Sequence, residues 1–98
     1  MKLRVSSRAQ RETDRVDAWW RKKRPAAPDL FLRELVYVVE LLMHSPTLGT
    51  VYEAEHFDGP VHRVLLERSG CHLFYGQLGG ELVILCIWGA RRKRGPKL

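Results

Sequence analysis

Hydrophobic and polar positions change their period along the chain, and each period predicts a kind of element. Met1–Ser6 alternates apolar and polar residues, which predicts a half-buried strand. A helix is then expected from Ser7, which forms a capping box with Gln10, to about Arg24. Pro25 ends this helix, because the residue before a proline disfavours the helical conformation. The apolar stripe of this helix consists of Ala9, Thr13, Val16 and Trp20.

A second helix is predicted from about Ala27 to His44. Its apolar residues cover a wider arc, so it should be buried more deeply than the first helix. The two helices should form an antiparallel hairpin on one face of a sheet. The apolar arc consists of Phe31, Leu32, Leu35, Val36, Val38, Val39, Leu42 and Met43. Solvated charges are expected on the first helix at Arg8, Arg11, Glu12, Asp14, Arg15 and Asp17.

The second half of the chain predicts three consecutive strands after a loop. Ser45–Pro60 contains prolines and glycines and reads as largely loop. The strands are expected at Val61–Glu67, Cys71–Leu78 and Glu81–Trp88, and Gly79–Gly80 is a strong hairpin signal between the last two. The predicted fold is a single α+β domain over residues 1–98, ordered β-α-α-β-β-β. A helical hairpin packs on one face of a small, mainly antiparallel sheet.

Glu81–Trp88 lacks the apolar and polar alternation of a strand with one wet face, so both of its faces should be covered. A turn at Gly79–Gly80 makes Leu78 face Glu81 and fixes the register. The face beneath the helices should then carry Val64, Leu66, Cys71, Leu73, Tyr75, Gln77, Leu82, Ile84, Cys86 and Trp88. The opposite face should carry Arg63, Leu65, Glu67, His72, Phe74, Gly76, Val83, Leu85 and Ile87.

The opposite face would be a large exposed apolar patch on a monomer with one helical layer, and such patches mark protein-binding sites. The alternative is that the Ser45–Pro60 loop folds over it. The residues expected to bind a partner protein on this face are Arg63, Leu65, Phe74, Val83, Leu85 and Ile87.

The formal net charge is +6, which favours an acidic partner such as nucleic acid, an anionic surface or an acidic protein segment. Much of this charge lies in a basic C-terminal tail, residues 89–98. Because Gly95–Pro96 prevents regular structure, the tail should be either a disordered end or a segment ordered by a partner. The tail residues expected to bind the target are Arg91, Arg92, Lys93, Arg94 and Lys97.

Metal and cofactor chemistry is not predicted. Cys71 and Cys86 lack metal-ligand spacing and are expected to be buried, reduced packing residues. No Gly-rich phosphate loop is present. The start of the chain lacks the apolar core of a signal peptide, and Glu81–Trp88 is too short to span a bilayer, so a cytoplasmic protein without membrane association is expected.

The order of several segments resembles the RelE/ParE superfamily, the toxins of bacterial type II toxin–antitoxin pairs. The matching segments are the helix ending in Trp19–Trp20, RPAAPDLFLREL, HSPTLG, VHRVLLERSGCHLFY, ELVILCIW and GARRKRGP. The resemblance covers most of the chain and agrees with the predicted topology. It implies that a cognate antitoxin binds the open sheet face and its rim and forms a hetero-oligomer with the toxin.

The resemblance leaves two targets open. RelE-like members cut messenger RNA on the ribosome, and here the candidate residues for that chemistry are Arg63, Arg68, His72 and Arg91. Two departures argue against it: Glu67 stands where those members carry an arginine, and no tyrosine follows Trp88. ParE-like members poison DNA gyrase without a catalytic set, and the basic tail resembles theirs more. A third possibility is a basic interaction module that has lost toxicity.

Overall fold

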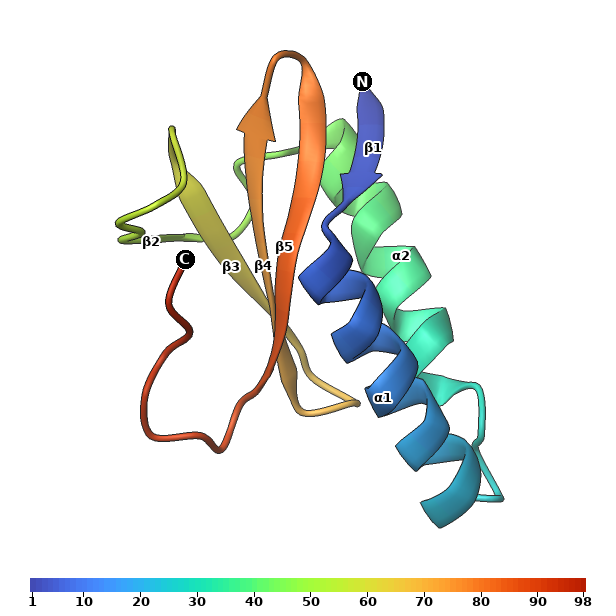
Figure 1. The fold of residues 1–98 in the computed structure, drawn as a ribbon. Coiled ribbons are helices and arrows are strands. Elements are labelled where there is room, and N and C mark those ends of the chain that lie inside the picture. Colours follow the sequence, from blue (N-terminus) through green and yellow to red (C-terminus); the bar gives the residue numbers. More distant parts are fainter.

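The computed structural model describes residues 1–98 and contains two helices and five strands (Figure 1). In chain order these are β1 (Lys2–Val5), α1 (Ser7–Lys23), α2 (Leu30–His44), β2 (Thr50–Tyr52), β3 (Val61–Leu66), β4 (Cys71–Leu78) and β5 (Glu81–Gly89). Neither helix is long and apolar enough to cross a membrane.

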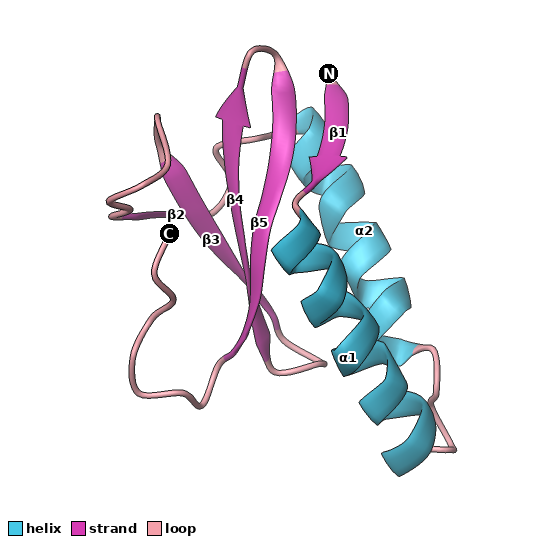
Figure 2. Ribbon diagram, viewed as in Figure 1, coloured by secondary structure: helices cyan, strands magenta, loops and turns pink.

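The five strands form one sheet in the order β1-β5-β4-β3-β2, and the two helices lie side by side on one of its faces (Figure 2). β1 runs parallel to β5, and the other three pairings are antiparallel. The predicted α+β class and the order β-α-α-β-β-β are confirmed. β2 is an additional strand inside the segment that was expected to be loop.

The N-terminal strand and α1 differ in detail from the prediction. β1 is an exposed edge strand, with Leu3 and Val5 at 46% and 41% exposure, and not a half-buried one. The N-cap of α1 is Ser6, whose hydroxyl accepts a hydrogen bond from the Ala9 N–H at 3.0 Å. The Ser7–Gln10 capping box is therefore wrong by one residue, because the serine with the extended backbone is the one preceding the helix.

α2 begins three residues later than predicted. Between the helices the Ala27 N–H donates to the Arg24 carbonyl, and the Leu30 N–H donates to the Ala27 carbonyl, so this segment forms turns. Pro28 disfavours the helical conformation at Ala27, the residue before it. Phe31, Val38 and Leu42 of α2 are buried, whereas Val36, which was expected in the apolar arc, is 55% exposed.

The β4–β5 hairpin follows the predicted register only near its turn. Leu78 faces Glu81 as expected, and the register holds as far as Tyr75, which faces Ile84. A β-bulge then shifts the pairing, so that Phe74 faces Cys86 and Leu85 has no partner. From this point the side chains of β5 exchange faces, because the side-chain period of a strand is two residues.

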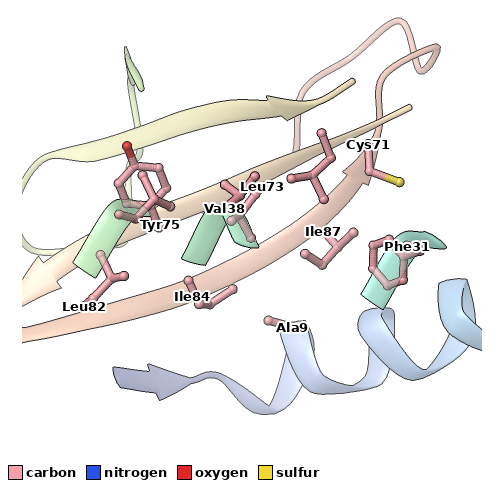
Figure 3. Packing of buried hydrophobic residues seen from close by; sticks show 11 residues of the cluster. Ala9, Phe31, Val38, Cys71, Leu73, Tyr75, Leu82, Ile84 and Ile87 are labelled. Carbon is pink, nitrogen blue, oxygen red and sulfur yellow. The ribbon is translucent and has the colours of Figure 1, made fainter. Parts of the chain in front are cut away.

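This shift corrects three of the predicted positions. Ile87 lies in the core beneath the helices, and Cys86 and Trp88 lie on the opposite face. Figure 3 shows Ile87 beside Phe31 and Leu73 in the helix-side core. The buried members of that core are Ala9, Phe31, Val38, Leu42, Leu66, Cys71, Leu73, Tyr75, Leu82, Ile84 and Ile87.

Glu12 of α1 supports the strand just beyond the bulge. Its carboxylate accepts hydrogen bonds from the Ile87 N–H at 2.9 Å and from Arg8 Nε at 3.1 Å. Ile87 is only 4% exposed, so its N–H would otherwise be a buried donor without an acceptor. Glu12 was predicted to be a solvated charge, and this prediction is wrong: its side chain is 18% exposed.

We therefore expect Glu12→Ala to lower the free energy of unfolding by about 1–3 kcal/mol, because it leaves the buried Ile87 N–H unpaired. Urea denaturation followed by circular dichroism measures the change. Asp14→Ala, which removes an exposed carboxylate from the same helix, is the control and should cost about 0.5 kcal/mol or less. Equal losses in the two variants would contradict the role given to Glu12.

Candidate functional site

The face of the sheet opposite the helices is covered by the chain itself. Val61, Phe74 and Cys86 form a second buried cluster there, with at most 1% exposure each. Residues from the β2 region, β5 and the C-terminus pack over it. They are Tyr52, Ala54, Phe57, Leu85, Trp88 and Leu98.

Two aromatic contacts show how closely the loop packs against the sheet. The ring of Tyr52 meets Phe74 edge-on, with 4.7 Å between centroids. Phe57 lies directly on the backbone of Gly76, where a Cβ atom would be only 2.5 Å from Phe57 Cε2. Only glycine permits this approach, and it brings the loop flat against β4.

The sequence predicted an exposed apolar face opposite the helices, and this prediction is wrong, because the chain itself covers that face. Phe74, Val83 and Ile87 are buried, Ile87 on the helix side, and Leu85 is half-buried. Only Arg63 and Leu65 remain exposed among the six residues expected to bind an antitoxin. The alternative, coverage by the loop, is correct in part, since the C-terminal tail contributes as well.

The C-terminal tail leaves the end of β5 and turns back toward the β2 region (Figure 1). Its backbone carbonyls accept hydrogen bonds from four separate parts of the fold. Trp88 Nε1 donates to the Arg94 carbonyl at 2.7 Å, and Tyr52 Oη donates to the Pro96 carbonyl at 2.8 Å. The His56 N–H donates to the Leu98 carbonyl, and a terminal guanidinium nitrogen of Arg8 donates to the Lys97 carbonyl, both at 2.8 Å. The expectation that this tail needs a partner for fixed geometry is wrong.

Trp88 anchors the beginning of the tail. The Arg92 guanidinium lies 3.6 Å from the centroid of its ring, and Arg8 lies 5.8 Å from it. Such cation–π contacts stabilise the charged group without removing it from water. Arg92 is therefore engaged in the fold, whereas the exposed side chains of Arg91, Lys93 and Arg94 form no hydrogen bond, ion pair or cation–π contact.

An open apolar groove lies between α2 and the free edge of β3. β2 pairs only with Val61–Arg63, so the edge of Val64–Leu66 has no neighbouring strand. The groove has a volume of about 970 Å³. Its exposed apolar residues are Tyr37, Leu41, Leu48 and Leu65, at 62%, 40%, 56% and 44% exposure.

The far end of the groove is held by Glu34. Its carboxylate accepts hydrogen bonds from the Arg68 N–H at 2.8 Å and the Ser69 N–H at 2.9 Å, and also from the Ser69 hydroxyl. These bonds fix the β3–β4 turn against α2. The Arg33 and Arg68 side chains are left exposed along the groove, beside its apolar floor.

The residues considered for ribonuclease chemistry occupy two places. Arg63 and His72 lie on the same face of neighbouring strands, where burial and the charge of Arg63 lower the pKa of His72. Arg68 lies in the β3–β4 turn, and the Ala90 N–H donates to Gly70 of that turn at 2.9 Å, which brings the start of the tail and Arg91 to this end. His72 Nδ1 is buried without a hydrogen-bond partner.

Three further reactive side chains, Cys71, Cys86 and Tyr75, are buried in the fold. Cys71 and Cys86 are buried free thiols, and burial raises the pKa of both, that of Cys86 to about 12. Tyr75 is fully buried, and its hydroxyl accepts a hydrogen bond from the Gly49 N–H at 2.8 Å. No cluster of three or more His, Cys, Asp or Glu residues is placed to hold a metal ion.

Deleting Pro96–Leu98 should destabilise the fold, because it removes the acceptors of Tyr52 and His56 and the Leu98 side chain. The expected loss is about 1–3 kcal/mol in the free energy of unfolding. Urea denaturation measures it, and binding of a hydrophobic dye reports the uncovered face. Lys97→Ala keeps the backbone carbonyl and is the control. Unchanged stability and dye binding in the deletion variant would contradict the covering role of the tail.

Comparison with known proteins supports the fold assignment. No protein-family model and no curated protein sequence matches the chain. Among solved structures, the chain is similar to a chain of the chromosomal ParDE TA system from P. aeruginosa, with a TM-score of 0.70 and 22% sequence identity. The similarity covers 93% of this chain and 97% of the other. The two chains share a fold over nearly their whole lengths, which is the fold that the RelE/ParE resemblance implies.

Proposed function

We propose that this protein is the toxin of a type II toxin–antitoxin pair, acting in the cytoplasm and held inactive by a cognate antitoxin. The observation that carries the proposal is the shared fold with a chain of a ParDE TA system, over 93% of this chain. The order of segments in the sequence supports the same assignment independently of the coordinates. A role in plasmid stabilisation is part of this proposal.

The antitoxin binds the groove between α2 and the β3 edge in this proposal, since the opposite sheet face is occupied. The exposed side chains of Tyr37, Leu41 and Leu65 offer the apolar surface that an amphipathic segment buries. Arg33 and Arg68 flank that surface and suit acidic residues on the antitoxin. The unpaired edge at Val64–Leu66 is open to an added strand.

The target is a macromolecule, which we propose to be DNA gyrase, and the toxin acts on it by binding alone. The free cations of the fixed tail are the proposed contacts: Arg91, Lys93 and Arg94. Their backbone is already ordered by the fold, so binding does not have to order it. The ribonuclease alternative has less support, because the lowered pKa of His72 disfavours an imidazolium and Tyr75 is buried.

Induced expression in a bacterial host should arrest growth, and the purified protein should inhibit gyrase supercoiling. Replacing Arg91, Lys93 and Arg94 together by glutamine should raise the concentration for half-inhibition about tenfold, because three charged contacts are lost. The control replaces Arg11, Arg15 and Lys22 of α1 by glutamine, which lowers the net charge equally. Cleavage of ribosome-bound messenger RNA with gyrase unaffected would overturn the gyrase proposal, and growth without arrest would overturn the toxin proposal.

Leu41→Glu should weaken antitoxin binding about ten- to a hundredfold, because it places a charge where an apolar residue is buried in the complex. The partner to test is the protein encoded by the adjacent reading frame, and calorimetry measures the affinity. Val51→Glu is the matched control, since Val51 is 74% exposed and lies in β2, outside the groove lining. Equal affinity of the Leu41→Glu variant and the wild-type protein would exclude the groove as the binding site.

A further inference from the structure

The outward face of α2 has an apolar centre that nothing covers. Phe31, Val38 and Leu42 of this helix point into the core, and Val36 and Tyr37 are 55% and 62% exposed. A shallow hollow of about 410 Å³ lies along this outward face. Its lining residues are Asp29, Leu32, Arg33, Val36, Tyr37 and Glu40.

Two opposite charges flank the apolar centre at equal distances. Arg33 lies one helical turn before the Val36–Tyr37 pair, and Glu40 lies one turn after it. Both side chains are exposed, and neither forms an ion pair or a side-chain hydrogen bond within the chain. The ion pairs that the chain does form involve other residues, including Arg21 with Asp17 and Asp29.

We propose that, when no antitoxin fills the neighbouring groove, this outward face of α2 docks against the same face of a second copy of the chain, with the two α2 helices antiparallel. The two contacts exclude one another, because Arg33 and Tyr37 line both the groove and the outward face. An antiparallel, two-fold arrangement centred on Val36–Tyr37 brings Arg33 opposite Glu40 of the partner subunit, and Glu40 opposite Arg33 of the partner subunit. The centre of the interface then buries Val36 and Tyr37 against their own counterparts. The dipoles of the two antiparallel helices also attract one another, which favours association.

Charge argues for a second copy rather than an unrelated partner. The chain carries a net charge of +6, so two copies repel unless they meet through a locally neutral surface. The outward face of α2 is neutral at its centre, because Arg33 and Glu40 balance. Two-fold symmetry satisfies both of these unpaired charges in each copy at once, which an arbitrary acidic or basic partner would not do.

The interface is small, which sets the expected affinity. α2 has 15 residues and is therefore about 22 Å long. One helix pair of this length buries less than the roughly 1,200 Å² of a stable standard interface. The dimer should accordingly be weak, concentration-dependent and weakened by salt.

Sedimentation equilibrium of the full chain over a concentration series tests the proposal. The wild-type protein should show a monomer–dimer equilibrium. Arg33→Glu or Glu40→Arg alone should raise the dissociation constant about tenfold, because each places like charges opposite one another twice. The combined R33E/E40R variant should restore the dimer, since it exchanges the two partners of each pair.

Arg15→Glu on α1 changes the net charge by the same amount as Arg33→Glu and is the control for net charge. At high salt, where the effect of net charge is screened, its dimer dissociation constant should equal that of the wild-type protein. Circular dichroism confirms that each variant is folded, and Val36→Lys, at an exposed position, tests the centre of the interface if a reversal variant unfolds. A wild-type chain that stays monomeric at every concentration would overturn the proposal. So would a dimer that is insensitive to Arg33→Glu, Glu40→Arg and Val36→Lys, or one that the double variant does not restore.

Discussion

The fold depends on covering the internal strand β5 on both faces. Two helices can cover only one face of a sheet this small, so the second face must be covered by other parts of the chain. Tyr52 and Phe57 from the β2 region and Leu98 from the C-terminus supply that cover. The tail carbonyls that bond to Tyr52 and His56 hold it in place. The basic tail is thus part of the folded structure, and its free cations are presented on a rigid backbone.

Much of the architecture follows from the sequence, because long periodic segments and a Gly-Gly turn are strong local signals. Both helices, the last three strands and the pairing of Leu78 with Glu81 are of this kind. The β-bulge at Leu85 leaves no signal in the local sequence. The residues around it are all apolar, so an extra residue does not change the pattern of apolar and polar positions. The bulge places Ile87 beneath the helices and Trp88 at the tail, and Glu12 becomes a structural acceptor as a result.

The candidate site was only partly predictable for a related reason. A sequence shows that a face is apolar, but not whether a distant segment returns to cover it. The bonds from Tyr52 to Pro96 and from Arg8 to Lys97 join residues 44 and 89 positions apart. The groove beside α2 could not be predicted, because it exists only where β2 stops pairing and leaves the Val64–Leu66 edge of β3 open. With the opposite face covered, the exposed apolar residues on and beside α2 include Val36, Tyr37, Leu41, Leu48 and Leu65, and we place both proposed protein contacts there.

Hydrogen exchange of the isolated monomer, followed by NMR, tests the central claim most directly. If the chain covers its own sheet, the His56 N–H and the Trp88 indole N–H should exchange much more slowly than in an unstructured peptide, because both donate to tail carbonyls. Exchange of both protons at the unprotected rate, with the strand amides still protected, would show that the tail is free and would contradict the account.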